Sequence, residues 1–139
     1  MDVTNRVLNE LLVLIVDDNP PSTELMHILL SEQGAYVQQA KSGKDALLRV
    51  ADRRPHVIIT DIEMPDMDGW SLIHSLKSRT ATGDIPILVV SAYDSAAFIK
   101  RAMVLGCQDY MVKPIHPETF VKRITDILSE IPALADHFA

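Results

Sequence analysis

The stretch VIITDIEMPDMDGW, residues 57–70, decides the fold. It begins as a run of β-branched residues, which is typical of a buried strand, and the run stops at Asp61. Further acids follow at Glu63, Asp66 and Asp68. A strand that ends in this way places several carboxylates together at one edge of a sheet. Because like charges repel, such a group needs a compensating partner.

Two periodicities alternate along the rest of the chain. Short runs rich in apolar and β-branched residues predict strands at 11–16, 35–39, 56–60, 86–91 and 109–112. Helical spacing of apolar residues predicts helices at 21–34, 43–54, 68–79, 94–106 and 117–131. Three of the strands are apolar nearly throughout, as expected for strands covered on both faces. Five strands that alternate with five helices predict an α/β fold with a parallel sheet and right-handed crossovers.

Single residues mark several of the predicted helix ends. Gly34 is expected to cap the C-terminus of the first helix, and Pro55 to end the second. Asp94 is a candidate N-cap for the fourth helix, where a side-chain oxygen can accept a backbone N–H. Pro117 suits the first turn of the fifth helix, because the N–H that proline lacks is not needed there.

The length and composition indicate one domain. The chain has 139 residues, of which 47% are hydrophobic and 23% are charged, which is ordinary for a globular protein. We expect residues 11–131 to form the domain and residues 1–10 to be a lead-in. Residues 132–139 are expected to be a C-terminal tail or the start of a linker.

Charge and cysteine content limit the partners and the compartment. The net charge of −6 and the scattered basic residues argue against direct binding of nucleic acid, which favours a basic face. No apolar run approaches the roughly 18 residues of a membrane span, and no signal peptide is recognisable. The single cysteine, Cys107, cannot form an internal disulfide, which is typical of a reducing compartment. We therefore expect a cytoplasmic protein without a membrane partner.

Chemistry-bearing residues lie at the ends of four predicted strands. Asp17 and Asp18 follow the first, Asp61 follows the third, Ser91 closes the fourth, and Lys113 follows the fifth. In open α/β sheets, ligands bind beyond the carboxyl ends of the strands. We therefore expect two acidic groups, a hydroxyl and a lysine to meet at one edge of the sheet.

The acids at this edge predict a metal ion. Two carboxylates about 4 Å apart repel by roughly 4 kcal/mol at an effective dielectric constant near 20. A hard divalent cation removes this repulsion, and Mg²⁺ is commonly held by one or two carboxylates together with phosphate oxygens. A site with Mg²⁺, a free carboxylate, a hydroxyl and a lysine suits an incoming phosphoryl group, whose charge must be neutralised during transfer.

Four motifs resemble the receiver domain of two-component response regulators, the CheY-like family. They are LIVDDN at 14–19, ITDIEMPDMDG at 59–69, PILVVSA at 86–92 and GCQDYMVKP at 106–114. Each motif alone is weak, but all four occur in order, each at the end of a predicted strand, and the resemblance covers about residues 10–131. The resemblance implies a flavodoxin-like, doubly wound sheet of five parallel strands in the order 2-1-3-4-5, with five helices.

The same resemblance assigns roles to individual residues. Asp61 matches the aspartate that accepts the phosphoryl group, and Lys113 matches the lysine that pairs with the phosphoryl oxygens. Ser91 matches the hydroxyl that moves to grasp the phosphoryl group, and Tyr110 matches the aromatic residue that swings inward behind it. The bond between Lys113 and Pro114 is implied to be cis.

The resemblance also implies which groups hold Mg²⁺. Asp18 matches the direct ligand, Asp17 the acid that usually binds through water, and Asp61 the phosphoryl acceptor, which shares the metal. Glu63, two residues after the acceptor, matches the position that contributes a backbone carbonyl. In the family, the positions of Glu63 and Tyr93 flank the site and influence how fast the acyl phosphate hydrolyses.

Together these features imply a signalling switch that catalyses only its own phosphorylation and dephosphorylation. Asp61 would receive phosphorus from the phosphohistidine of a sensor histidine kinase or of a histidine phosphotransfer protein. The movement of Ser91 would vacate space for Tyr110 and bias a surface formed by the fourth helix, the fifth strand and the fifth helix. That surface would bind a downstream effector or output domain, or a second phosphorylated copy of the chain.

Two other functions fit parts of the pattern. A Mg²⁺-dependent hydrolase with an aspartyl-phosphate intermediate shares the chemistry. Its usual signature, however, has the nucleophile on the first strand and a second acid two residues later, where this chain reads DDNPP. A degenerate receiver would bind partners without phosphorylation, although the full set of Asp17, Asp18, Asp61, Ser91 and Lys113 argues against it. Taken alone, Asp17 or Asp18 could simply cap the first helix.

Overall fold

A computed structural model of the chain describes residues 8–64 and 67–138. Its elements, in chain order, are β1 (Leu12–Val16), α1 (Pro20–Glu32), β2 (Tyr36–Ala40), α2 (Gly43–Asp52), β3 (Val57–Thr60), α3 (Gly69–Lys77), β4 (Ile87–Ser91), α4 (Ala96–Val104), β5 (Asp109–Val112), α5 (Pro117–Ser129) and the 3₁₀ helix η2 (Pro132–His137). The five strands and five α-helices alternate as predicted, and their ends lie within two residues of the predicted ends. Residues 1–7 of the expected lead-in, together with Asp66 and Ala139, lie outside the described residues.

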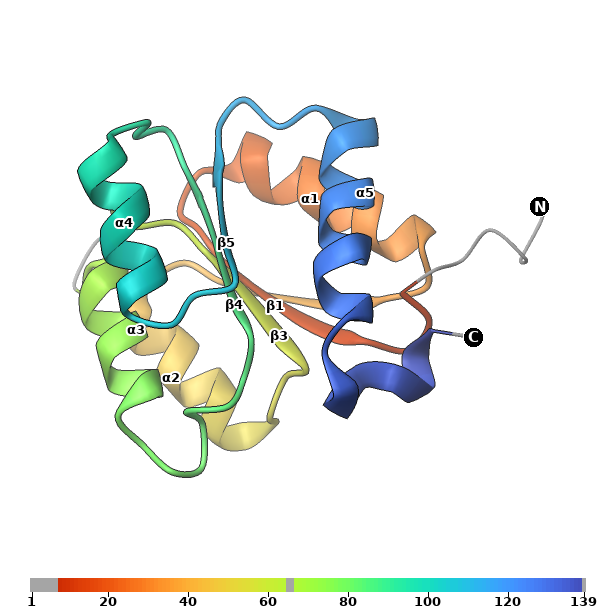
Figure 1. Cartoon of the computed structure of the whole chain (residues 1–139), viewed down its shortest axis with the longest axis horizontal. Helices are drawn as coiled ribbons and strands as arrows, with labels where there is room; N and C mark the ends of the chain where they lie inside the picture. Colours follow the sequence, from red (N-terminus) through yellow and green to blue (C-terminus); the bar gives the residue numbers. More distant parts are fainter. Residues whose placement is uncertain (1–7, 65–66, 139) are drawn as a thin grey trace.

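The strands form one parallel sheet in the order β2-β1-β3-β4-β5. Helices α1 and α5 cover one face of the sheet, and α2, α3 and α4 cover the other (Figure 1). The predicted flavodoxin-like, doubly wound α/β fold is therefore confirmed. Within the described residues, no helix is long and apolar enough to cross a membrane.

Strand β1 shows why the central strands are apolar throughout. Its five residues are all buried, and their side chains alternate between the two faces of the sheet. Leu14 and Val16 join the core beneath α2, α3 and α4, whereas Val13 and Ile15 join the core beneath α1 and α5. Each buried aliphatic side chain of this size stabilises the fold by about 1.5–3 kcal/mol. The strand is thereby fixed from both sides, and so are the acids that follow it.

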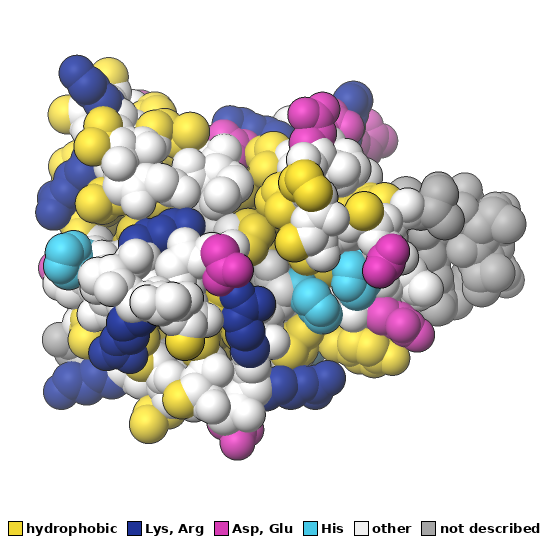
Figure 2. All heavy atoms as spheres, turned by 60° about the horizontal axis from the view of Figure 1, so that its bottom comes forward, with side chains coloured by type: hydrophobic (Ala, Val, Ile, Leu, Met, Phe, Trp, Pro, Cys, Tyr) yellow, Lys and Arg dark blue, Asp and Glu magenta, His cyan; other side chains and the backbone are white. Residues whose placement is uncertain are grey.

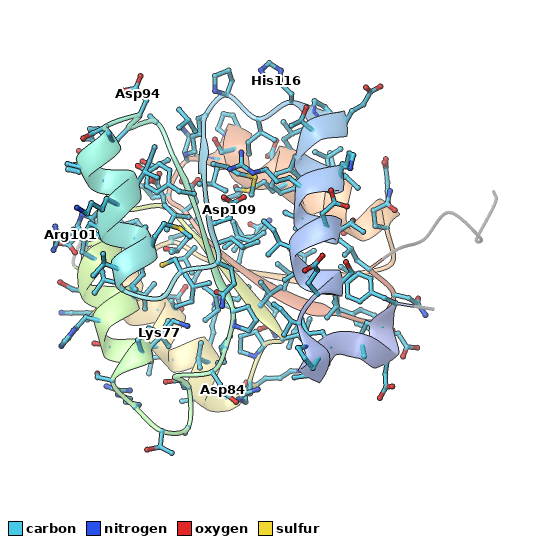
Figure 3. The ribbon with its side chains drawn as sticks, viewed as in Figure 1. Lys77, Asp84, Asp94, Arg101, Asp109 and His116 are labelled. Atoms are coloured by element: carbon cyan, nitrogen blue, oxygen red, sulfur yellow. The ribbon has the colours of Figure 1, made fainter. Side chains whose placement is uncertain are left out.

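The helix ends confirm two predictions and correct a third. Gly34 follows the C-cap of α1 with a φ of 94°, and Pro117 lies in the first turn of α5. Asp94, however, does not cap α4, because the helix begins at Ala96 and Ser95 is its N-cap residue. The side chain of Ser95 makes no capping hydrogen bond, and Asp94 lies exposed ahead of the helix (Figure 3). Of the two adjacent cap-type residues, Asp94 and Ser95, the second therefore occupies the N-cap position.

The segment after α5 packs against the start of the sheet. Helix η2 buries Leu134, which joins the core that contains Leu8 and Leu11. Both of these leucines come just before β1, so η2 covers the end of the sheet where the strands begin. Residues 132–137, expected as a tail or the start of a linker, form part of the packed structure.

Candidate functional site

The ends of four strands bring the predicted residues together at one edge of the sheet. Asp17 and Asp61 directly follow the last register partners of β1 and β3. Ser91 ends β4, and Lys113 follows the register partner of Ser91 at the end of β5. The pairing continues past the strands, since the N–H of Asp61 donates to the carbonyl of Val16 and the N–H of Lys113 to that of Ser91, both at 2.8 Å. Because the strands are parallel, all four side chains lie at the carboxyl end of the sheet.

Lys113 holds two of the acids together. Its Nζ atom lies 2.9 Å from Oδ2 of Asp17 and 3.1 Å from Oδ2 of Asp61. Burial lowers the pKa of Lys113, but the hydrogen bond to Asp17 and the charges of both acids outweigh burial and raise it above its ordinary value. Burial raises the pKa of Asp17, and the hydrogen bond from Lys113 offsets only part of this effect. The ammonium group therefore stays charged at neutral pH and compensates the acids. The peptide bond between Lys113 and Pro114 is cis, as the resemblance implied.

Asp61 is fixed in direction and still reachable from outside. Its Oδ1 accepts the backbone N–H of Ile62 at 2.6 Å, while its Oδ2 accepts from Lys113. The residue is 9% exposed and opens into a cavity of about 550 Å³. Four more of the predicted site residues line the same cavity, namely Asp18, Glu63, Ser91 and Lys113. The structure therefore brings the predicted acceptor, lysine, hydroxyl and acids to one open site.

Ser91 and Tyr110 are both buried, and both are bonded to the backbone of Tyr93. The Oγ atom of Ser91 accepts the N–H of Tyr93 at 3.1 Å, and the hydroxyl of Tyr110 donates to the carbonyl of Tyr93 at 2.7 Å. Tyr110 is only 4% exposed, so its ring points inward, and burial raises the pKa of its hydroxyl. A single residue thus joins the two groups that the resemblance pairs in a switch.

The side chains of Glu63 and Tyr93 meet at the cavity. The hydroxyl of Tyr93 donates to Oε2 of Glu63 at 2.6 Å, and both residues line the cavity. This hydrogen bond and the charge of Glu63 raise the pKa of Tyr93. The contact joins the loop after β3 to the loop after β4.

The donor set fits Mg²⁺ in kind. Asp17, Asp18 and Asp61 offer carboxylate oxygens and Glu63 offers a backbone carbonyl, which are the hard ligands that Mg²⁺ prefers. Across residues 8–64 and 67–138, no three acidic, histidine or cysteine side chains converge as a preformed metal site. The ammonium of Lys113 instead lies between Asp17 and Asp61. Because Mg²⁺ keeps several waters and needs only one or two carboxylates, two carboxylates such as those of Asp18 and Asp61 would be enough to hold it.

Asn19 supports the site, although it is not among the predicted site residues. Its backbone N–H donates to Oδ1 of Asp17 at 2.9 Å, and its side chain caps α1 by accepting the N–H of Ser22. The cap role considered for Asp17 and Asp18 therefore belongs to Asn19. An asparagine directly before two prolines is a recognisable start of a helix, so the signal was present in the sequence.

Gly69 is required by a close approach of the chain behind Asp61. A Cβ atom at this position would lie 2.3 Å from the carbonyl oxygen of Asp61 and 2.5 Å from the Cα of Ile62. The N–H of Gly69 also donates to the carbonyl of Ile62 at 2.6 Å. The first turn of α3 is thus packed directly against the backbone of the predicted phosphoryl acceptor.

Comparisons with known proteins identify the family. The family model of the response regulator receiver domain matches residues 13–125. Protein PilH of Pseudomonas aeruginosa is 30% identical over 117 residues, which cover 84% of this chain and 97% of that protein. The DNA-binding dual master transcriptional regulator RpaA of Synechocystis is 30% identical over 128 residues, which cover 90% of this chain and 53% of that protein.

Solved structures agree with these relatives. A response regulator from Chloroflexus aurantiacus matches with a TM-score of 0.82 and 30% identity, covering 88% of this chain and all of that one. The chemotaxis response regulator CheY4 of Vibrio cholerae matches with a TM-score of 0.78 and 29% identity, covering 86% of this chain and all of that one. The chain therefore belongs to the response regulator receiver domains of two-component systems.

Proposed function

We propose that the chain is a phosphorylation-operated switch in which Asp61 accepts a phosphoryl group. The donor is the phosphohistidine of a sensor histidine kinase or of a histidine phosphotransfer protein. A carboxylate oxygen of Asp61 forms a bond to phosphorus, the bond from phosphorus to the imidazole nitrogen breaks, and that nitrogen keeps the electron pair. The position of Lys113 Nζ between Asp17 and Asp61, at an open cavity, is the observation that carries this proposal.

Lys113 and Ser91 stabilise the group that is transferred. Lys113 is charged and already lies 3.1 Å from the Asp61 oxygen, so it can neutralise charge on the phosphoryl oxygens without a large movement. Ser91 accepts a hydrogen bond from Tyr93, and its hydroxyl also carries a proton that it can donate. Once its side chain turns toward Asp61, that O–H donates to a phosphoryl oxygen.

The acids beside Asp61 hold Mg²⁺ in this proposal. Asp18 and Asp61 would be its side-chain ligands, Asp17 would hold it through water, and Glu63 would contribute its backbone carbonyl. When bound, the ion supplies positive charge that neutralises the phosphoryl oxygens. Asp17 has a second task, because its hydrogen bond keeps Lys113 charged and directed toward Asp61.

The signal leaves through the surface of α4, β5 and α5. Its charged residues are Lys100, Asp109, Glu118, Lys122, Arg123 and Asp126, whereas Arg101, also on α4, lies over Trp70 of α3. Arg123 pairs with Asp109, which Figure 3 shows in β5, and Lys122 pairs with Asp126. The surface binds a downstream effector or output domain, or a second phosphorylated copy. Sedimentation with and without beryllofluoride tests the dimer, and an unchanged mass would exclude it.

Residues 11–131 act as the receiver domain in this proposal, and the chain turns over no substrate other than its own phosphoryl group. Several relatives are transcriptional regulators longer than this chain, such as TcrX of Mycobacterium tuberculosis, of which the matched region covers 49%. In those proteins the matched region is thus one part of a longer chain. The surface of α4, β5 and α5 determines which partner binds to this chain.

Incubation with Mg²⁺ and acetyl phosphate, followed by intact-mass measurement, tests the proposed function. We expect the wild-type chain to gain one phosphoryl group, and Asp61→Asn or a chelator to abolish the gain. A wild-type chain that gains no mass would contradict the proposal. Sustained hydrolysis of varied phosphomonoesters would instead support the Mg²⁺-dependent hydrolase.

A further inference from the structure

Tyr93 connects the site to helix α4 through its backbone and its side chain. Its backbone N–H is bonded to Ser91 and its carbonyl to Tyr110, so both groups of the proposed switch act on the same residue. Its hydroxyl is bonded to Glu63 across the cavity. Any change in the position of Ser91 therefore acts on a residue that is held at three other points: its carbonyl, its hydroxyl and its ring.

The ring of Tyr93 begins a row of three aromatic side chains, Tyr93, Phe98 and Trp70, which we call the aromatic row. The rings of Tyr93 and Phe98 meet edge to face, with centroids 5.3 Å apart and planes at 68°. Those of Phe98 and Trp70 do the same at 5.8 Å and 85°. The guanidinium of Arg101 lies 4.4 Å from the centroid of the Trp70 ring. The row thus runs from the loop after β4, through α4, to the first turn of α3.

Helix α4 buries little of its surface against the body of the protein. Among its nine residues, all of which the structure describes, only Ala102 is buried. Phe98 packs against the core through the aromatic row, and Arg101 extends the contact to α3 on the side of α4 that faces away from β5 (Figure 3). Phe98 and Arg101 therefore connect the first two turns of α4 to Trp70, and Ile99 packs beside them against the same core. A displacement of Tyr93 has a direct route to this part of the helix.

We propose that Tyr93 is a positioning residue that transmits phosphorylation of Asp61 through the aromatic row to α4 and to Trp70 in α3. This inference rests on the proposed function. When Ser91 turns toward a phosphoryl oxygen, the hydrogen bond from the Tyr93 N–H is lost. The added negative charge also repels Glu63, which loosens the second contact of Tyr93 at the cavity. The Tyr93 ring then shifts against Phe98, and the pair formed by Trp70 and Arg101 changes.

The fluorescence emission of Trp70 reports directly on the change in its surroundings, because Trp70 is the only tryptophan of the chain. The wild-type chain is phosphorylated with Mg²⁺ and acetyl phosphate, the phosphoryl content is read by intact mass, and emission is recorded on the same sample. We expect phosphorylation to change the emission intensity. Phe98→Leu, which breaks the aromatic row outside the cavity, is expected to lose at least about half of the fractional change while it still takes up one phosphoryl group.

Two further variants separate transmission from simple loss of packing. Tyr93→Phe keeps the ring but removes the hydrogen bond to Glu63, and we expect a smaller change in emission at equal phosphoryl content. Met103→Leu alters an exposed residue on the same helix and is expected to keep the full change. Thermal unfolding of each variant confirms that it is folded.

The outcomes also separate this inference from the proposed function. A full gain of mass without a change in Trp70 emission would overturn the aromatic row as a route and leave the proposed function standing. The same conclusion follows if Phe98→Leu and Tyr93→Phe both keep the wild-type change in emission. A wild-type chain that gains no mass would overturn the proposed function, and the inference with it.

Discussion

The two ends of the same sheet use polar side chains in opposite ways. At the carboxyl end, Asp17, Asp61 and Lys113 are largely buried, and they meet at an open cavity. At the amino end, His56 and His137 lie edge to face, with ring centroids 4.6 Å apart. Figure 2, which brings the lower end of the molecule in Figure 1 forward, shows two histidine side chains side by side there.

The histidines at the amino end serve the backbone. The N–H of Leu12, the first residue of β1, donates to Nδ1 of His56 at 2.8 Å. Nδ1 of His137 lies 2.9 Å from the carbonyl of Asn9, and Leu134 in the same 3₁₀ helix is buried. The two histidines at this end thus form hydrogen bonds with backbone groups at and just before the start of β1, while apolar residues such as Leu134 cover it.

The polar groups at the two ends of the sheet thus serve different purposes, stability at the amino end and chemistry at the carboxyl end. A buried ion pair must offset the cost of removing both charges from water, and well-packed apolar residues are often at least as stabilising. The charged cluster at the carboxyl end is therefore weak evidence for stability, whereas His56 and His137 at the amino end hold backbone groups in place. We infer that the cost at the carboxyl end is retained because the charges are used for phosphoryl transfer.

Loss of Lys113 is expected to have the largest effect. Lys113→Met removes the cation nearest to Asp61, and we expect phosphoryl uptake from acetyl phosphate to slow by a factor of roughly 10²–10³, since electrostatic stabilisation of the transferred group is lost. Rates come from intact mass as a function of time. Lys44→Met, which changes an exposed lysine on α2, is the control and should keep the wild-type rate. Equal rates for the wild type and Lys113→Met would remove the chemical reason for the charged cluster.

Gly69→Ala is expected to disturb the carboxyl end through the backbone. The added Cβ would lie 2.3 Å from the Asp61 carbonyl oxygen, so the chain must shift, at a cost of about 1–3 kcal/mol or more in the free energy of unfolding. Urea unfolding measures this cost. Ser71→Ala, at an exposed position in the same turn, should change stability by no more than about 0.5 kcal/mol. A Gly69→Ala variant as stable as Ser71→Ala would show that the close approach is not required.

Magnesium is expected to stabilise the chain through the carboxyl end alone. At a concentration about a hundredfold above its dissociation constant, the ion should raise the free energy of unfolding by about 2.7 kcal/mol. Thermal unfolding with increasing Mg²⁺ measures the effect, and Asp18→Asn should weaken it. A response that is unchanged in Asp18→Asn would place the ion elsewhere.

Mild acid is expected to weaken the amino end. Burial lowers the pKa of His56, and the positive charges of His137, Arg54 and Arg53 lower it further. The unfolded chain therefore binds the proton more readily than the folded chain. Stability should be full above the ordinary value of 6.5 and fall as the pH drops below it, because protonated Nδ1 cannot accept from Leu12.

Substitution of His56 isolates this effect from other titrating groups. His56→Gln keeps a possible acceptor for the strand but does not titrate. The difference in urea stability between the wild type and His56→Gln should therefore change between neutral pH and about pH 5.5. A difference that stays constant over this range would exclude His56 as the cause.

The fold and most of the site could be predicted because local sequence determines them. β1 is buried on both faces, so its apolar run is unambiguous, and the acids that follow it lie at the edge of the sheet. The same reasoning places Asp61 after β3 and Lys113 after β5. Parallel strands then bring these ends together without any information on loops.

Contacts that depend on loop conformation could not be predicted. Tyr93 and Glu63 are 30 residues apart, and their hydrogen bond requires two loops to meet. The burial of Leu134 depends on a partner surface formed by the opposite end of the chain. Asp94 and Ser95 are both good cap residues, and only the structure shows that α4 starts after the second.

Chemical mapping of the phosphorylated position tests the central claim most directly. Borohydride reduces an aspartyl phosphate to homoserine, and peptide mass spectrometry then locates the changed residue. The phosphorylation of Asp61 predicts homoserine at position 61 in the phosphorylated wild-type chain, and none in a sample kept with a chelator. Homoserine at another aspartate, or phosphorus retained on a histidine or serine, would contradict the account.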